Sequence, residues 1–144
     1  MLQRIQSLYL LIAAILSGGL VFMVPFWTNE NQIVVGMLDV LNEEKGFYLL
    51  VPALFIVSVV LSLISLFSFK KRSNQIINNR INIVVNFFLL GIIVYRLLNL
   101  PGETEVSEKG IGMFIPLLVI VFLVLANKSI QKDERLVKSV DRLR

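Results

Sequence analysis

The sequence predicts an all-α integral membrane four-helix bundle, with both chain termini in the cytoplasm and a cytoplasmic amphipathic C-terminal helix. Three observations predict it: the composition, four uncharged blocks, and the distribution of Lys and Arg. Of the 144 residues, 56% are hydrophobic and 17% are charged, and the mean hydropathy is +0.80. Soluble domains average about 45–50% apolar and about 25% charged residues. We therefore expect one domain, residues 1–144, that is surrounded by lipid.

The uncharged blocks predict the positions of the membrane-spanning helices. They cover residues 5–29, 46–69, 81–95 and 110–127. A helix needs about 20 mainly apolar residues to cross a bilayer core of about 30 Å. The third block reaches this length with its flanks, if Arg80 and Arg96 extend toward opposite interfaces. We predict transmembrane helices near residues 5–27, 47–69, 76–100 and 111–126.

The first block also raises the alternative of a cleaved signal peptide. The apolar part of a signal peptide normally runs for about 7–15 residues before its cleavage site. Here the apolar character continues through Phe26 and Trp27, which favours a membrane helix.

Basic residues predict the orientation, because short cytoplasmic loops are enriched in Lys and Arg. On the side opposite the termini stand Lys45, Arg96 and Lys109. The side of the termini carries Arg4, Lys70, Lys71, Arg72, Arg80, Lys128, Lys132, Arg135, Lys138, Arg142 and Arg144. Loops 28–45 and 101–110 are therefore expected outside, and the tail 127–144 in the cytoplasm. The net charge of +4 marks topology, so we expect the lipid bilayer and no nucleic acid as a partner.

Small residues indicate where the helices approach one another. Lipid removes the hydrophobic drive between helices, so close packing of small side chains becomes important. Ala14 and Gly18 are one turn apart in the first predicted helix, and Ser58, Ser62 and Ser65 share a face of the second. We interpret these five as helix-packing residues. A serine stripe that lines a polar path is the alternative.

The third predicted helix is the most polar. Asn82 and Asn86 lie one turn apart on its cytoplasmic half, and Arg96 lies toward its outer end. Amides at this depth must face protein or water. They are candidate intramembrane polar residues, either as hydrogen bonds between helices, which we favour, or as a substrate site. We expect Arg96 to extend toward a partner in the outer loops.

Nothing in the sequence points to catalysis. The chain contains no Cys and no His, and none of its 10 acids falls within a predicted span. The motifs of metalloproteases, serine hydrolases and nucleotide-binding loops are missing. We therefore predict no catalytic, metal or cofactor site.

Two segments outside the predicted spans carry apolar side chains. Loop 28–45 contains enough of them to predict a short strand or helix rather than a plain tether. In the tail, Leu136, Val137, Val140 and Leu143 are spaced to form one stripe on a helix. This helix either continues from the fourth span or breaks from it, and the stripe could bind a partner or the membrane surface. We predict partner binding.

Both ends of the chain carry a resemblance to a known family. The opening MLQRIQSLYLL (1–11) and the ending LANKSIQKDERLVKSVDRLR (125–144) resemble the ends of a family of small membrane proteins. That family is classified as a domain of unknown function and occurs mainly in Bacteroidota. The resemblance covers the whole chain and implies four helices in a Gram-negative inner membrane. It supplies no catalytic residues.

These observations favour a non-catalytic accessory or structural subunit of a larger inner-membrane complex, for example one for protein export or envelope biogenesis. Its expected partners are other inner-membrane subunits. One alternative is a small transporter or lipid-handling protein that uses Asn82, Asn86 and Arg96. A membrane enzyme is the second alternative.

Overall fold

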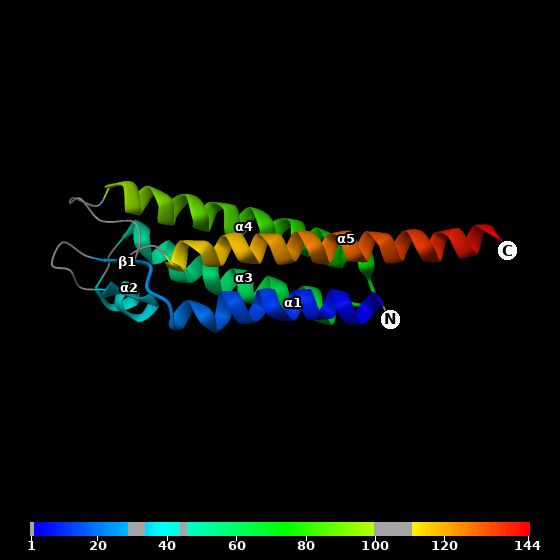
Figure 1. Cartoon of the computed structure of the whole chain (residues 1–144), viewed down its shortest axis with the longest axis horizontal. Helices are drawn as coiled ribbons and strands as arrows, with labels where there is room; N and C mark the ends of the chain where they lie inside the picture. The colour runs from blue at the N-terminus through cyan, green and yellow to red at the C-terminus, as the bar shows by residue number, and fades with distance from the viewer. Residues whose placement is uncertain (1, 29–33, 44–45, 100–110) are drawn as a thin grey trace.

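Four long helices form the body of the protein. The structure is a computed structural model that describes residues 2–28, 34–43, 46–99 and 111–144. The long helices are α1 (Leu2–Gly18), α3 (Leu50–Phe67), α4 (Arg72–Asn99) and α5 (Phe114–Arg142). Both termini lie at the same end of this bundle (Figure 1). The predicted all-α class is confirmed, and the predicted loop 101–110 lies outside the described residues.

Helix boundaries differ from the predicted ones where local chemistry decides them. α1 ends at Gly18 rather than near residue 27, and a short 3₁₀ turn, η1 (Leu20–Phe22), follows it. Gly18, Gly19 and Pro25 explain this end, because glycine and proline are the weakest helix formers. α4 starts at Arg72, earlier than residue 76, directly after the tight α3–α4 turn.

The fourth predicted span and the tail form one helix. α5 continues from Phe114 to Arg142 without interruption, so the expected boundary at residue 127 has no structural counterpart. The helix contains no glycine, and its one proline, Pro116, stands in the first turn, where proline is tolerated. Figure 1 shows α5 running past the N-terminus of α1 and past the start of α4.

Each helix packs on two neighbours. α1 contacts α3 and α5, and α4 contacts the same two helices. The fully buried apolar core includes Leu10, Leu89, Ile93, Val119 and Leu123. Large hydrophobic side chains also cover the outside of the bundle. Within the described ranges, four helices are long and apolar enough to cross a membrane, as expected of a multi-pass membrane protein.

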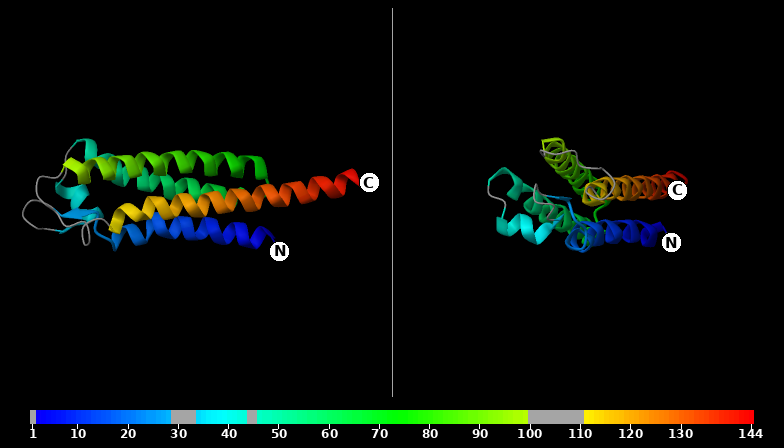
Figure 2. Two further views of the ribbon diagram at one scale, coloured as in Figure 1. Left: turned by 45° about the horizontal axis from the view of Figure 1, so that its top comes forward. Right: turned by 60° about the vertical axis from the view of Figure 1, so that its left-hand side comes forward.

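The loop after α1 is folded, as its apolar residues predicted. Strands β1 (Trp27–Thr28) and β2 (Val34–Val35) pair antiparallel, and α2 (Met37–Glu43) and the turn η2 (Phe47–Leu49) follow. Residues 29–33 and 44–45 of this loop are outside the described ranges. These short elements cap the bundle at the end away from the termini (Figure 2).

Aromatic packing and one glycine attach this cap to the helices. Phe26 is fully buried and lies against Phe55 of α3, with 5.6 Å between the ring centroids. The amide of Gly112, in the turn η3 (Ile111–Met113), donates a hydrogen bond to the carbonyl of Pro25. A Cβ atom on Gly112 would stand 2.6 Å from Phe26 Cδ1, so this close approach requires glycine.

Candidate functional site

Hydrogen-bonded amides and hydroxyls join α3 to α4 inside the bundle. Asn82 Nδ2 donates to the Ser62 hydroxyl (2.8 Å) and to the Ser58 carbonyl (3.1 Å). Asn86 Nδ2 donates to the Ser58 hydroxyl (2.9 Å) and to Asn82 Oδ1 (3.0 Å). All four side chains are fully buried. The predicted serine stripe and the predicted amide pair therefore face each other, and this placement favours hydrogen bonding between helices.

A second set of hydrogen bonds joins Ser65 of α3 to α4 and α5 through Asn79 and Asn127, which the sequence analysis did not select. The Ser65 hydroxyl donates to Asn79 Oδ1 (2.6 Å), and Asn79 Nδ2 donates to Asn127 Oδ1 (2.8 Å). Gln75 and Asn79 continue the spacing of Asn82 and Asn86 along one face of α4, which was the available signal. Asn127 gave no such signal, because its partner stands 48 positions away in the sequence.

One atom of the network is left over. Asn86 Oδ1 is buried and has no hydrogen-bond partner among the described residues. Each hydrogen bond between helices described above pairs a neutral donor with a neutral acceptor. Such an arrangement holds helices together without supplying a nucleophile, a general base or a charge.

The small residues Ala14 and Gly18 lie at the margin of the buried face of α1. The most buried face of α1 is formed by Leu10, Ala13 and Ser17, whereas Ala14 and Gly18 are half-buried at its margin. A Cβ atom on Gly18 would stand 3.0 Å from Val59 Cγ2 of α3. Gly18 therefore admits a bulky branched neighbour rather than another small residue.

Arg96 does not join the amides. It lies half-buried in the last turn of α4, ten residues beyond Asn86, or about 15 Å along the helix axis. The structure thus does not bring the three predicted polar residues into one site.

An apolar groove lies on the half of α4 that is next to the cap. It has a volume of about 750 Å³ and is lined by Phe47, Phe87, Phe88, Gly91, Ile92 and Tyr95. Its walls are mainly aromatic.

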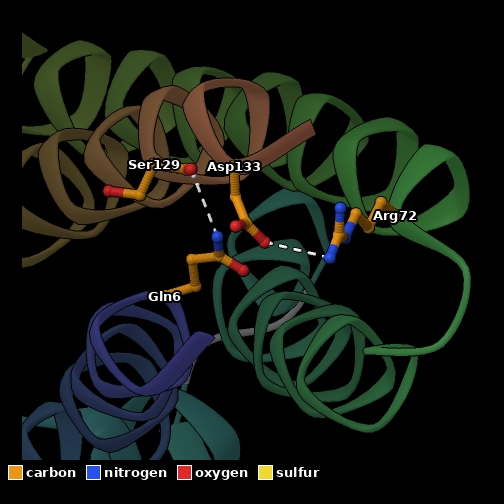
Figure 3. Close-up of polar contacts among 4 residues, drawn as sticks. All are labelled: Gln6, Arg72, Ser129 and Asp133. Atoms are coloured by element: carbon orange, nitrogen blue, oxygen red, sulfur yellow. Dashed lines mark hydrogen bonds and ion pairs between the residues drawn. The ribbon is translucent and has the colours of Figure 1, made fainter. Parts of the chain in front are cut away.

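Polar contacts fasten α5 near the end of the bundle that holds the termini (Figure 3). Gln6 Nε2 of α1 donates to the carbonyl of Ser129 (3.2 Å). Arg72, at the start of α4, places Nη2 3.1 Å from Asp133 Oδ2, with these side chains 26% and 15% exposed. Asp133 Oδ2 accepts no hydrogen bond among the described residues, so its contact with Arg72 is an ion pair. These contacts fix α5 as far as Asp133.

Beyond Asp133 the apolar stripe of α5 is open. Leu136 is 48% exposed, Val137 43%, Val140 60% and Leu143 89%. On the solvent side, Glu134 and Lys138 form an ion pair one turn apart (2.9 Å). The hydrogen bond from Lys138 and its positive charge hold the pKa of the Glu134 carboxyl below its ordinary value. Glutamate placed before lysine at this spacing supports helix formation.

The stripe continues the packing face of α5 rather than starting a new one. Val119, Ala126, Asp133 and Val140 follow one another at intervals of seven residues, and so do Phe122, Ser129, Leu136 and Leu143. A seven-residue interval keeps side chains on nearly the same side of a helix. Val119 and Ala126 are fully buried against the other helices. We call the exposed continuation, Leu136, Val137, Val140 and Leu143, the tail seam.

Comparison with the curated proteins gives no match, and comparison with the solved structures gives none. The sequence model of one family matches residues 2–143. Its description is a domain of unknown function, DUF4293. The match includes all four long helices and the whole tail seam. The chain therefore belongs to the DUF4293 family.

Proposed function

We propose that this protein is a non-catalytic structural subunit of a larger bacterial inner-membrane assembly, and that the tail seam binds another subunit. In this proposal the four long helices span the membrane and both termini are cytoplasmic. The observation that carries the proposal is the uninterrupted α5, which leaves the bundle with an open apolar seam.

Charge supports the orientation. The termini and the α3–α4 turn share one end of the bundle, and Lys70 and Lys71 are exposed there. Lys128, Lys132 and Arg135 are exposed on the adjoining part of α5. A cluster of basic residues at one end of a membrane bundle marks the cytoplasmic side.

The length of α5 supports binding of the tail to a protein rather than to the membrane surface. Its 29 residues extend for about 43 Å, whereas the hydrocarbon core is about 30 Å thick. The last turns therefore stand outside the core. A helix that continues straight from a membrane span must bend before it can lie on the bilayer, and beyond its first turn α5 has no proline or glycine at which to bend.

Burial supplies the driving force for this binding. Fully burying one Val or Leu side chain stabilises a complex by about 1.5–3 kcal/mol. The seam presents four such side chains at 43–89% exposure. Contact with a partner would remove most of this surface from water.

Truncation after Arg135 tests the proposal, because it keeps the Arg72–Asp133 ion pair and removes the seam. We expect the truncated protein to remain in alkali-washed membranes and to lose the subunits that co-purify with the full chain from native membranes. Val137→Asp with Val140→Asp should give the same loss.

Two matched variants serve as controls. Leu118→Ile changes an exposed side chain within the spanning part of α5, and Lys138→Ser changes the solvent side of the tail. Both should retain every co-purifying subunit. Full retention by the truncated protein would contradict the proposal.

A further inference from the structure

We infer that the tail seam and the α3–α4 turn together form one site for an acidic amphipathic segment of a protein on the cytoplasmic side. This inference rests on the proposed function and specifies its partner. The site combines an apolar wall on α5 with a basic edge on the α3–α4 turn.

The geometric basis is a notch between these two elements. It encloses about 570 Å³ and is lined by Phe69, Lys70, Arg72 and Val137. Phe69 is 53% exposed although it is a large aromatic side chain. Val137 belongs both to the notch and to the tail seam, so a bound segment would contact the two surfaces together.

The direction of the seam argues against a parallel α5 from a second copy of the chain as the occupant. Because the seam continues the face that α5 turns toward α1 and α4, the space in front of it lies over the cytoplasmic end of its own bundle. Packed helices lie about 8–10 Å apart. A parallel α5 from a second copy, placed at that distance, would run into α1 and α4. The occupant must therefore approach from the cytoplasm.

Charge selects an acidic occupant. Lys70 lines the notch and is exposed, and Lys71, next to it in the α3–α4 turn, is exposed as well. Of the acids at this end of α5, Asp133 and Glu134 are already paired with Arg72 and Lys138. Asp141 lies one turn beyond Val137. Complementary charge around an apolar contact gives a binding site its preference among partners.

The test uses the full chain in nanodiscs of neutral lipid and two synthetic helical peptides of equal length. Both peptides carry the same leucine face, and their flanking positions are all Glu in one and all Lys in the other. We expect the Glu peptide to bind in fluorescence anisotropy and the Lys peptide to bind about tenfold more weakly or not at all. Val137→Asp should weaken binding of the Glu peptide by about tenfold.

A change of charge keeps the test independent of folding. The double variant Lys70→Glu, Lys71→Glu should reverse the preference, so that the Lys peptide binds better. Arg80→Glu, an exposed charge further along α4, should leave the preference unchanged. A reversal cannot come from an unfolded protein, because unfolding would abolish both interactions.

The outcomes separate this inference from the proposed function. If truncation after Arg135 releases the native subunits but Lys70→Glu, Lys71→Glu does not reverse the peptide preference, the function stands and the acidic partner is wrong. If truncation releases no subunit, both the proposed function and the acidic partner are contradicted. A photo-crosslinker at Val137 that labels phospholipid and never the bound Glu peptide would assign the notch to lipid and overturn the inference.

Discussion

Replacing Asn82 with leucine tests how much the buried amides stabilise the bundle. Asn82 donates two hydrogen bonds to α3, to Ser58 and Ser62. Hydrogen bonds between membrane helices average about 0.6 kcal/mol each. Their loss, with the slightly larger leucine side chain in a packed position, should lower the free energy of unfolding by about 1–2 kcal/mol.

Asn86→Leu provides the sharper comparison. It removes the hydrogen bond to the Ser58 hydroxyl and those to Asn82 within α4, but it also removes Asn86 Oδ1, which has no partner among the described residues. Leaving a buried acceptor unpaired costs about 1–3 kcal/mol, so the removal of Asn86 Oδ1 offsets part of the loss. We expect Asn86→Leu to be less destabilising than Asn82→Leu.

Unfolding by sodium dodecyl sulfate in mixed micelles, followed by circular dichroism, measures both variants. Asn74→Leu, at an exposed position near the start of α4, is the control and should be neutral. The reasoning is refuted if Asn86→Leu costs as much as Asn82→Leu, or if Asn82→Leu behaves like the control.

Three further predictions concern the cap, the orientation and the tail. Gly112→Ala should destabilise the protein by about 1–3 kcal/mol in the same micelle assay because its Cβ would overlap Phe26, whereas Gly91→Ala, with open space around it, should not; equal effects would contradict the packing. A cysteine at Ser139 should be protected from an impermeant thiol reagent added to intact cells, and one at Glu105 should react; the reverse would invert the topology. The pKa of Glu134 is lowered in the folded chain, so its ion pair supports the tail helix above the ordinary carboxyl pKa and is lost as the pH falls through the lowered value. Amides near Glu134 should therefore be better protected from hydrogen exchange in the wild-type chain than in Glu134→Gln above the ordinary carboxyl pKa, and the two proteins should converge as the pH falls; equal protection at neutral pH would show that the pair does not matter.

Hydropathy alone predicted the four long helices, because a membrane span must be long, apolar and internally hydrogen-bonded. Helical spacing placed Ser58, Ser62 and Asn82 on faces that the structure brings together. The ends of α1 and α4 were less predictable, because hydropathy does not distinguish a helical residue from an apolar residue in a turn. Whether the tail continues the fourth span or breaks from it was left open, since an apolar stripe has the same spacing in either case.

The rest depended on contacts between distant segments. The pairing of Asn79 with Asn127 requires the relative depth and rotation of α4 and α5, which no local pattern encodes. The cap also depends on a contact between distant segments. Its strands of two residues are too short to form without the contact between Phe26 and Phe55. The ion pair of Arg72 with Asp133 joins two residues that the sequence had assigned to the topology signal and to the tail.

The position of the tail seam relative to the membrane tests the central claim most directly. Spin labels at Leu136 and Val140, with Leu118 as the lipid-facing reference, can be compared by their accessibility to oxygen and to a water-soluble nickel chelate. The protein would be reconstituted without partners in liposomes that contain anionic lipid. We predict that both seam positions are more accessible to the nickel chelate and less accessible to oxygen than Leu118, because α5 carries them out of the bilayer. Oxygen accessibility at Leu136 and Val140 as high as at Leu118 would show that the tail lies in the membrane, and would contradict the proposed subunit contact.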